Sequence, residues 1–574
     1  MDAAEVSLRG LEPRTFSTRR ALTISRERAT GLALLLALAV GFGLRWPVLV
    51  VNPFHEDEAL YSTWALRIAE GTDPWLDGVM VDKPPLFPYL LGGLFRLLGP
   101  SEVVARLPGL AAGLGSILCL YGLARRLYGR EAGLLAAWSL ALSPFHISLS
   151  GTAFTDPLMV FWGLASLWAA AGQRWLLAGG CLGLAASTKQ HGLFFIPLVL
   201  LLSLLWWAEP VAVACRPAVR GSRPPRLLPL LPAAGLMGMG VVAPGRVRGS
   251  GWKGRVSKVA SLVAGFALPM GLTTWWDAHR WAFRPSYFDR SLTAYGGIRL
   301  ARLEELPERL RDWAALAGYL GVSPWVNGLL VAAAGALAFH ATWVLLKGKG
   351  SSGFRAALTD LLWLAFGGCY LLGHWASNFQ AWDRYLLPLA PLASLVLARG
   401  FILAGERLHR LPTFPRRVGA GALIALGVLL AFAFWQPAAQ ASASRLPLGA
   451  DHGAYDGMAV VAEWLRVNVG EDQPVYHRWL GWHLGYYLHG SAVEPRWYPD
   501  ADELVRVVGQ REGGYLVAPT WHSLHAERVA LARAGYRLEM LIRARGREET
   551  CAVTVYRVAP GAPPRLERMG GVPW

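Results

Sequence analysis

Apolar residues in this chain are bunched into runs of about 20 residues, the length that an α-helix needs to cross the hydrocarbon core of a bilayer. Apolar residues make up 54% of the 574 residues and charged residues 17%, against about 25% charged in soluble proteins. This pattern excludes a disordered chain and predicts a polytopic α-helical membrane protein. About eleven spans are expected, at 31–51, 103–124, 132–149, 152–171, 175–190, 192–208, 257–276, 322–346, 356–376, 383–403 and 418–437.

The distribution of charge predicts how these spans are oriented. The net charge is +17, and many of the basic residues lie in short links between alternate spans, such as Arg125, Arg126 and Arg130. The loop 52–102 instead carries eight acidic residues against three basic ones. Because basic links stay in the cytoplasm, the N-terminus is predicted inside and this first loop outside. The links account for the basic residues, so no nucleic-acid partner is expected.

Three regions follow from this topology and from a change in roughly the last 135 residues, which are mixed and charged and in which strand-like and helix-like runs alternate. They are a basic cytoplasmic N-terminus at 1–30, a membrane domain at 31–437 and an extracytoplasmic α/β domain at 438–574. The membrane domain contains the outer loops 52–102 and 277–320 and a basic cytoplasmic link at 209–256, in which the Pro/Gly-rich stretch 227–245 is either cytoplasmic or re-entrant. The first span is interpreted as an uncleaved signal anchor. The five cysteines are far apart and predict neither a disulfide framework nor a thiolate metal site.

Several ionisable side chains lie at the predicted outer face. Glu56, Asp57 and Glu58 directly follow the first span, where three carboxylates face water or a polar cavity because their burial in lipid is unfavourable. A simple helix start explains them equally well, and helix capping or a lipid-facing ammonium explains Asp156 and Lys83 individually. Their joint placement argues for a site. It is formed by Asp57, Lys83, Asp156, Lys189, His374 and Arg384.

Such a combination suits transfer of a group from a lipid phosphate. A carboxylate accepts the proton of the incoming hydroxyl or amine, while Lys and Arg bind the phosphate and stabilise the departing charge. Two readings from other classes stay open on the residues alone. One is a transporter or flippase of lipid-linked or small polar solutes. The other is an assembly protein whose outer domain binds a partner through an aromatic cluster. The same rings are also explained as the hydrophobic core of that domain. The cluster consists of Trp479, Trp482, His483, Tyr486, Tyr487, Trp497 and Tyr498.

Two first-loop motifs resemble a known family. Asp57-Glu58-Ala-Leu-Tyr61, followed by Asp82-Lys83-Pro84-Pro85-Leu86, is similar to the first-loop motif of the C-type integral-membrane glycosyltransferases. The similarity is to the bacterial branch with the aminoarabinose transferases and protein O-mannosyltransferases. Weaker matches are Arg106-Leu-Pro108 and Arg384-Tyr385-Leu-Leu-Pro388. Gln190-His191 departs from the Gly-Pro that relatives often have there, which leaves the role of Lys189 open.

The resemblance implies an enzyme that transfers a sugar from a polyprenyl-phosphate-linked donor to a protein, lipid or glycan acceptor, usually with inversion, at the outer face of the cell membrane. It implies Asp57 as the base, with Glu58 and Asp156 as further catalytic carboxylates, and a donor phosphate bound by Lys83, Arg384 and Tyr385. The supporting residues are His55, Tyr61, Lys189 and His374. The resemblance does not determine a cofactor, and Glu56, Asp57 and Asp156 are candidate ligands for a divalent cation. The loop 277–320 is a candidate lid.

Overall fold

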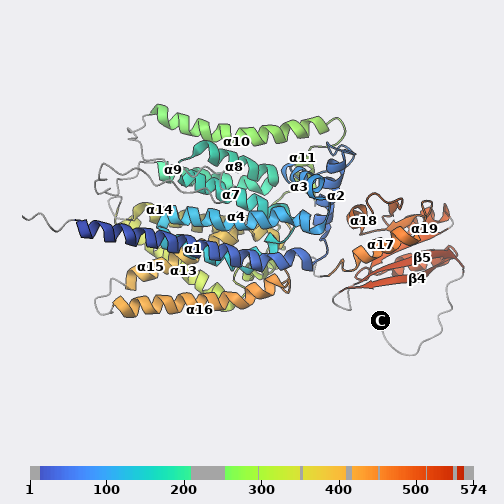
Figure 1. The fold of residues 1–574 in the computed structure, drawn as a ribbon. Coiled ribbons are helices and arrows are strands. Elements are labelled where there is room, and N and C mark those ends of the chain that lie inside the picture. Colours follow the sequence, from blue (N-terminus) through green and yellow to red (C-terminus); the bar gives the residue numbers. More distant parts are fainter. Residues whose placement is uncertain are drawn as a thin grey trace, which may run out of the picture.

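The computed structural model describes residues 13–207, 252–294, 297–348, 353–408, 416–449, 453–511, 513–546 and 552–561. The stretch 227–245 and the basic link up to residue 251 lie outside them. Most of the described residues form a bundle of roughly parallel and antiparallel helices (Figure 1). In chain order these are α1 (Pro13–Val51), α2 (Glu56–Glu70), α3 (Leu86–Leu98), α4 (Glu102–Tyr128), α5 (Arg130–Ala141), α6 (Pro144–Ser150), α7 (Thr155–Ala171), α8 (Trp175–Thr188), η1 (Gln190–Phe194), α9 (Phe195–Trp207), α10 (Trp252–Arg280), α11 (Tyr287–Thr293), α12 (Leu306–Gly318), α13 (Pro324–Leu346), α14 (Phe354–Ala376), η4 (Asp383–Leu386), α15 (Leu389–Leu408) and α16 (Arg416–Ser442).

Each predicted span falls on helix, and the polytopic helical class is confirmed. The span 132–149 is divided between α5 and α6, which bend by 61° at their junction. Among the described residues, six helices are long and apolar enough to cross a membrane, or up to seven if this bent pair is one span. Helices α7, α8 and α9 are shorter, with 17, 14 and 13 residues. The count of eleven therefore stays a prediction.

A buried arginine explains how the bend between α5 and α6 is tolerated. A helix end leaves carbonyl groups without intrahelical partners. Arg45 of α1 donates to the carbonyls of Leu140 and Ala141 at 3.0 Å each and to His146 Nδ1 at 2.6 Å. The Arg45 side chain thus provides hydrogen-bond donors for the last carbonyl groups of α5 and also holds α6 in place.

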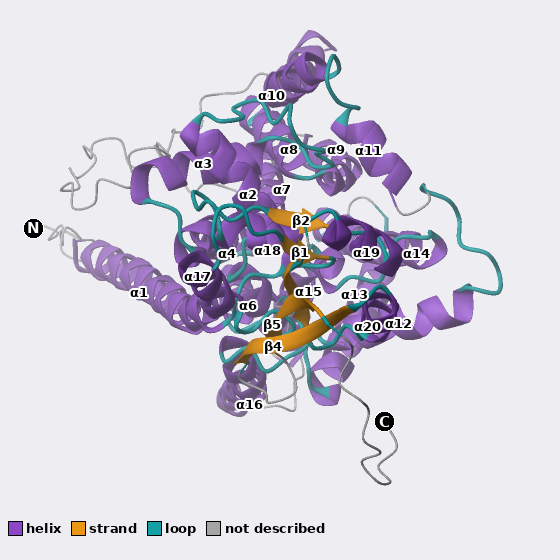
Figure 2. Cartoon of the chain, turned by 90° about the vertical axis from the view of Figure 1, so that its right-hand side faces the viewer, coloured by secondary structure: helices purple, strands orange, loops and turns teal. Residues whose placement is uncertain are grey.

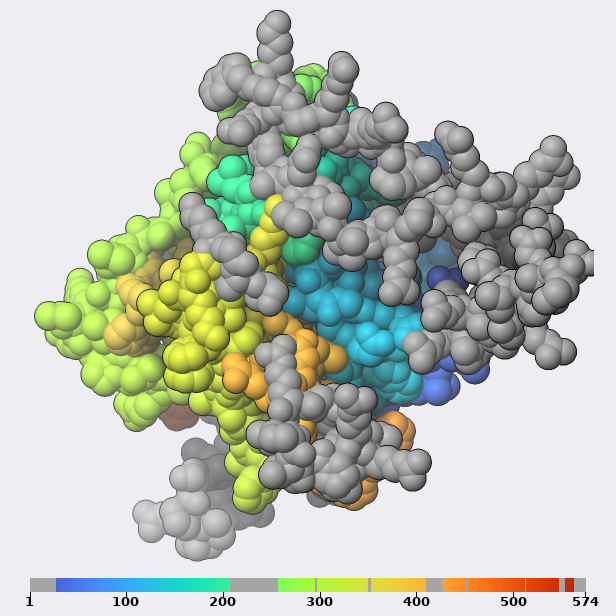
Figure 3. Space-filling view, turned by 90° about the vertical axis from the view of Figure 1, so that its left-hand side faces the viewer, coloured from blue at the N-terminus to red at the C-terminus, as the bar shows by residue number. Residues whose placement is uncertain are grey.

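At the end of the bundle opposite the sheet, helices from distant parts of the chain meet through buried polar groups. Figure 3 views this end, with α4 in light blue, α14 in yellow and α15 in orange side by side. Arg399 of α15 donates to Asp360 of α14 at 3.3 Å, and Trp363 Nε1 donates to the Tyr128 hydroxyl at 3.1 Å. Arg399 is therefore a buried helix residue that ties α14 to α15.

The chain ends in a small mixed sheet flanked by helices, which confirms the predicted α/β character of this part. Its elements are α17 (Met458–Asn468), β1 (Val475–His477), α18 (Gly481–Tyr487), β2 (Pro495–Trp497), α19 (Ala501–Gly509), β3 (Gly514–Pro519), α20 (His525–Arg533), β4 (Tyr536–Arg545) and β5 (Ala552–Pro560). The strand order is β2-β1-β3-β5-β4. Strand β1 is parallel to β2 and β3, whereas β5 is antiparallel to β3 and β4.

This sheet lies across the end of the bundle, with α18 beside the first loop (Figures 1 and 2). His483 Nε2 of α18 donates to the carbonyl oxygen of Phe54 at 2.9 Å, and the Thr63 hydroxyl of α2 lies 3.3 Å from the carbonyl oxygen of Trp482. Tyr487 also donates to Glu102. These contacts hold the sheet against the segment that carries the acidic triplet.

Candidate active site

The helix start at the acidic triplet orients its three carboxylates differently. His55 caps α2: its Nδ1 accepts the N–H of Asp57 at 3.1 Å, and its own N–H donates to Glu58 Oε2 at 2.9 Å. This reciprocal pattern is a capping box. It turns Glu58 inward, where it is buried, and leaves Asp57 half-buried and Glu56 exposed. His55 thus acts here as a positioning residue.

Asp57 is paired with an arginine more than 300 residues away in the chain. The Arg384 guanidinium, in η4, donates to Asp57 Oδ2. It also lies over the rings of Phe154 and Trp382, at 5.0 and 4.6 Å from their centroids. Two aromatic faces and one carboxylate therefore fix the guanidinium, an arrangement that suits a planar, delocalised cation.

The second predicted carboxylate is paired in the same way. Lys189, at the end of α8, donates to Asp156 Oδ1 at 2.6 Å, and both side chains are almost fully buried. The Lys189 ammonium lies 4.6 Å from the ring centroid of Tyr385, the residue after Arg384. Tyr385 thus joins the two pairs, and Lys189, whose role the sequence left open, lies inside the cluster.

Lys83 completes the arrangement. Its ammonium donates to the neighbouring Asp82, and Gln190 Nε2 donates to the Asp82 carbonyl at 2.7 Å. Gln190, one of the two residues that depart from the family pattern, thereby ties the first loop to the end of α8. Three cations and three carboxylates converge at the sheet end of the bundle, each cation paired with one carboxylate.

Charge neighbours control the ionisation of Asp57. Burial raises its pKa, but the electrostatic effect of Arg384, with smaller effects of His55 and Lys83, outweighs burial and lowers the pKa to about 2. Asp57 is therefore an anion at neutral pH, although a carboxylate with so low a pKa is a weak base. Burial and the nearby carboxylates of Asp57 and Asp82 raise the pKa of the Tyr61 hydroxyl, which keeps it protonated.

Glu58 has a different environment from Asp57. Arg106 of α4 binds it bidentately at 2.9 and 2.8 Å, and Ala153 N–H, just before α7, donates to it at 2.7 Å. The same guanidinium donates to the carbonyls of Leu49, Asn52 and Pro53 at 2.7 to 2.9 Å. This buried pair joins α1, α2, α4 and the loop before Asp156. Its contacts favour a positioning role for Glu58, and its predicted catalytic role stays a prediction.

His374 and Tyr61 lie in aromatic surroundings at the edge of the cluster. His374 is buried at the end of α14, with Nδ1 2.9 Å from the Tyr370 carbonyl and its ring 6.0 Å from that of Tyr385. Tyr61 packs against Phe87 and Trp64. His191, which the sequence singled out only as a departure, stacks on Tyr385 with 4.6 Å between ring centroids.

The residues do not form a cation site in this arrangement. Among the described residues, no group of three or more His, Cys, Asp and Glu side chains is placed to hold a metal ion. The donor set explains this, because Asp57 and Asp156 are each neutralised by a basic partner. The predicted ligands Glu56, Asp57 and Asp156 therefore do not fit a divalent cation here.

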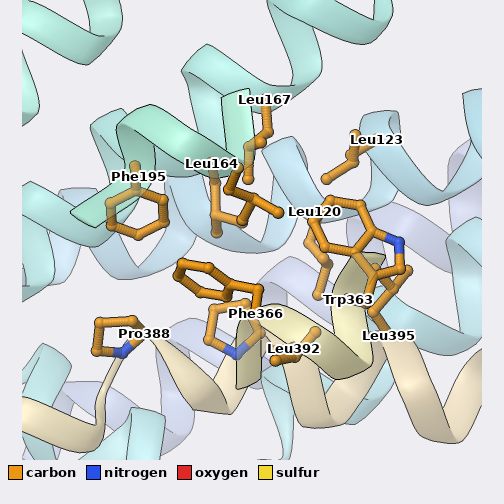
Figure 4. A pocket seen from close by; sticks show the side chains of 12 residues that line it. Leu120, Leu123, Leu164, Leu167, Phe195, Trp363, Phe366, Pro388, Leu392 and Leu395 are labelled. Carbon is orange, nitrogen blue, oxygen red and sulfur yellow. The ribbon is translucent and has the colours of Figure 1, made fainter. Parts of the chain in front are cut away.

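An apolar pocket lies inside the bundle, separate from these charges. Figure 4 shows it between α4, α7, α9, α14 and the start of α15, with Phe195, Phe366 and Pro388 among its lining residues. Its lining contains no ionisable side chain. This pocket therefore offers no acid–base or phosphate chemistry, in contrast to the charged cluster.

The proteins with sequence similarity to this chain are described as mannosyltransferases. A family model described as dolichyl-phosphate-mannose-protein mannosyltransferase matches residues 82–215. Two proteins of Bacillus subtilis (strain 168), YkcB and YycA, carry provisional names as mannosyltransferases. Each is 31% identical, over 93 and 125 residues, which cover 16% and 21% of this chain. The matched parts span only 13% and 18% of those relatives.

Solved structures match over nearly the whole chain. ArnT from Cupriavidus metallidurans in the apo state has a TM-score of 0.58 and 15% identity, and the match covers 92% of this chain and 98% of that one. The same protein bound to undecaprenyl phosphate has a TM-score of 0.53 and 14% identity, with coverage of 91% and 97%. At this identity the likeness establishes the fold.

Proposed function

We propose that this chain is a C-type integral-membrane glycosyltransferase, a proposal supported by its fold and by the family model that it matches. In this proposal it transfers a sugar from a polyprenyl-phosphate donor to an acceptor at the outer face of the cell membrane. The observation that carries the proposal is the convergence of Asp57, Arg384, Lys83, Asp156 and Lys189 from five separate segments. The match to ArnT bound to undecaprenyl phosphate supports the donor class.

The donor phosphate enters a site where each cation already has a partner. Arg384 has five N–H donors and Lys83 has three, and both side chains keep part of their surface accessible. A phosphate held by these two side chains gains charge-assisted hydrogen bonds. It also competes with Asp57 for Arg384. As the guanidinium turns to the phosphate, the main cause of the low pKa of Asp57 weakens, and its carboxylate becomes a stronger base.

The chemical step then needs a single displacement. Asp57 accepts the proton of the acceptor hydroxyl or amine, and the acceptor atom attacks the anomeric carbon. The bond from this carbon to the phosphate oxygen breaks, and its electron pair leaves with the polyprenyl phosphate. Arg384 and Lys83 stabilise the charge on this leaving group. Attack opposite the leaving group inverts the anomeric centre, and no nucleophilic side chain is required.

The proposed mechanism also gives roles to Asp156 and to the outer loop 277–320. Asp156, neutralised by Lys189, positions Tyr385 and Arg384 rather than moving a proton. The outer loop 277–320 starts on the first loop, because Arg280 donates to the carbonyls of Leu76 and Val79 at 3.0 Å each. Its closure over the site remains part of the proposal, as do the boundaries at residues 30 and 437. The charges gather at one end of the helices, which favours this function over a solute path through the membrane.

The test is donor consumption by the purified full-length protein in lipid nanodiscs. A panel of polyprenyl-phosphate sugars is supplied, and release of polyprenyl phosphate is measured. Asp57→Asn is expected to abolish release, while Asp502→Asn, the same change at an exposed residue of α19, leaves it unchanged. Full activity of Asp57→Asn removes Asp57 as the base. Failure to consume any donor, together with solute uptake in liposomes that lack donor, refutes the proposal in favour of a transporter.

A further inference from the structure

Of the exposed tryptophans on the C-terminal sheet domain, Trp479 and Trp521 lie beside each other, and we call these two the tryptophan platform. Trp479 and Trp521 expose 43% and 47% of their surface, and their ring centroids are 6.2 Å apart. The predicted aromatic cluster is divided by the fold. Its members on α18 pack against the first loop or are buried with it, whereas Trp479 keeps an open face. Trp521 was not singled out from the sequence.

Polar neighbours hold the platform in place. Trp521 Nε1 donates to the Ala454 carbonyl at 2.9 Å. The Arg478 guanidinium lies 5.3 Å from the Trp479 ring centroid, and the His522 ring lies 5.9 Å from the same ring. Arg478 and His522 both contact Glu527, at 3.7 and 3.1 Å. The two indoles are therefore fixed surfaces, with hydrogen-bonding side chains at their rim.

A row of contacts connects the platform to the base. Tyr455 meets Trp521 edge to face, with 6.2 Å between ring centroids, and stacks on His483 at 4.0 Å. The Tyr455 hydroxyl is hydrogen bonded to Glu56, the residue before Asp57. Tyr455 is itself buried, and its contacts place the platform close to Glu56 and therefore close to the carboxylate that is proposed to accept the proton.

We infer that the tryptophan platform binds a pyranose ring of the acceptor, so that the acceptor class is a carbohydrate chain. This inference rests on the proposed function and selects among its three open acceptor classes. The C–H face of a pyranose carries partial positive charge and stacks on the negative face of an indole. Its hydroxyl groups point sideways, where Arg478 and His522 offer hydrogen bonds.

A contact with the bilayer is the competing explanation, because tryptophans also gather at membrane interfaces. The rim argues against it. Arg478 forms an ion pair with Glu527 at the rim of the rings, and His522 contacts the same carboxylate. The row of contacts leads to Glu56, the neighbour of Asp57, rather than to the outside of the bundle. Carbohydrate binding uses both the polar side chains at the rim and the position near Asp57, whereas insertion into lipid uses neither.

The experiment measures sugar binding separately from transfer. Saturation-transfer difference NMR is recorded on the full-length protein in nanodiscs with mannohexaose and cellohexaose as probes. Saturation of the pyranose C–H protons is expected for at least one probe, and it should fall at least about fivefold in Trp479→Ala/Trp521→Ala. The matched control is Trp325→Ala, which removes a tryptophan that is 83% exposed on α13. Trp479→Phe/Trp521→Phe should retain most of the signal, which distinguishes a lost aromatic face from a misfolded domain.

The outcomes separate this inference from the proposed function. Equal saturation in the wild type and the alanine variant, or none in either, overturns the platform as a sugar site. Loss of fluorescence quenching by brominated phosphatidylcholine in the alanine variant, with sugar binding unchanged, assigns the rings to the membrane instead. Donor consumption is measured in parallel. Its failure with sugar binding intact refutes the transferase proposal but not the platform.

Discussion

Replacing Asp57 with asparagine is predicted to strengthen the binding of polyprenyl phosphate while it abolishes sugar transfer. The reason is that Arg384 donates to Asp57, whereas in the proposed function the same guanidinium binds the donor phosphate, so two anions compete for one cation. In the variant, the neutral amide no longer competes for this cation and no longer repels the phosphate. A residue needed for chemistry thus opposes binding of the ligand.

The expected increase in affinity for polyprenyl phosphate can be worked out from the electrostatics of Asp57. The pKa of Asp57, ordinarily 3.8, is lowered to about 2 although burial acts in the opposite direction. At 1.36 kcal/mol per pKa unit, this corresponds to about 2 kcal/mol in favour of the charged pair. The Asp57 side chain is 24% exposed, so solvent screening reduces the figure. About 1.4 kcal/mol remains, which is a tenfold decrease in Kd.

The assay is equilibrium binding of radiolabelled undecaprenyl phosphate to the full-length protein in nanodiscs. Wild type, Asp57→Asn and the exposed control Asp502→Asn are compared at neutral pH and low salt. The expected result is a Kd about tenfold lower for Asp57→Asn and unchanged for the control. An equal or higher Kd for Asp57→Asn refutes the competition between Asp57 and the phosphate.

Three further changes test other parts of the structure. Arg384→Gln is expected to raise the Kd for undecaprenyl phosphate, and it removes the main cause of the low pKa of Asp57. As the pH is lowered, kcat/KM of the wild type should show no decrease from protonation of Asp57 above about pH 4, whereas kcat/KM of Arg384→Gln should begin to decrease at a higher pH. Identical pH profiles for the two proteins contradict this effect of Arg384 on Asp57. Arg106→Met leaves Glu58 as an unpaired buried charge, so a loss of about 3–5 kcal/mol in stability is expected, measured as a lower unfolding temperature in detergent. Gly179→Ala should also lower that temperature, because a Cβ there would lie 1.9 Å from the Leu262 carbonyl oxygen where α8 meets α10; a melting curve like that of the wild type would show that the two helices can separate.

The sequence alone identified the helices and the first-loop residues, because the signals for both are local. The length of an apolar run predicts a span by itself, and all the predicted spans fall on helix. Asp57, Glu58 and Lys83 belong to a short motif whose order in the chain is its signature. The C-terminal change to shorter, mixed segments was also sufficient to predict an α/β domain.

Only the tertiary structure decided which charges are partners. Glu58 and Asp57 are neighbours in the chain, yet the capping of α2 directs one to Arg106 and the other to Arg384. Lys189 and Asp156 are 33 residues apart, and the packing of α7 against α8 brings them to 2.6 Å. The packing of α18 against the first loop separates Trp482, which contacts that loop, from Trp479, which stays exposed. Ion pairing and exposure depend on distances between segments far apart in the chain, and residue order does not encode these distances locally.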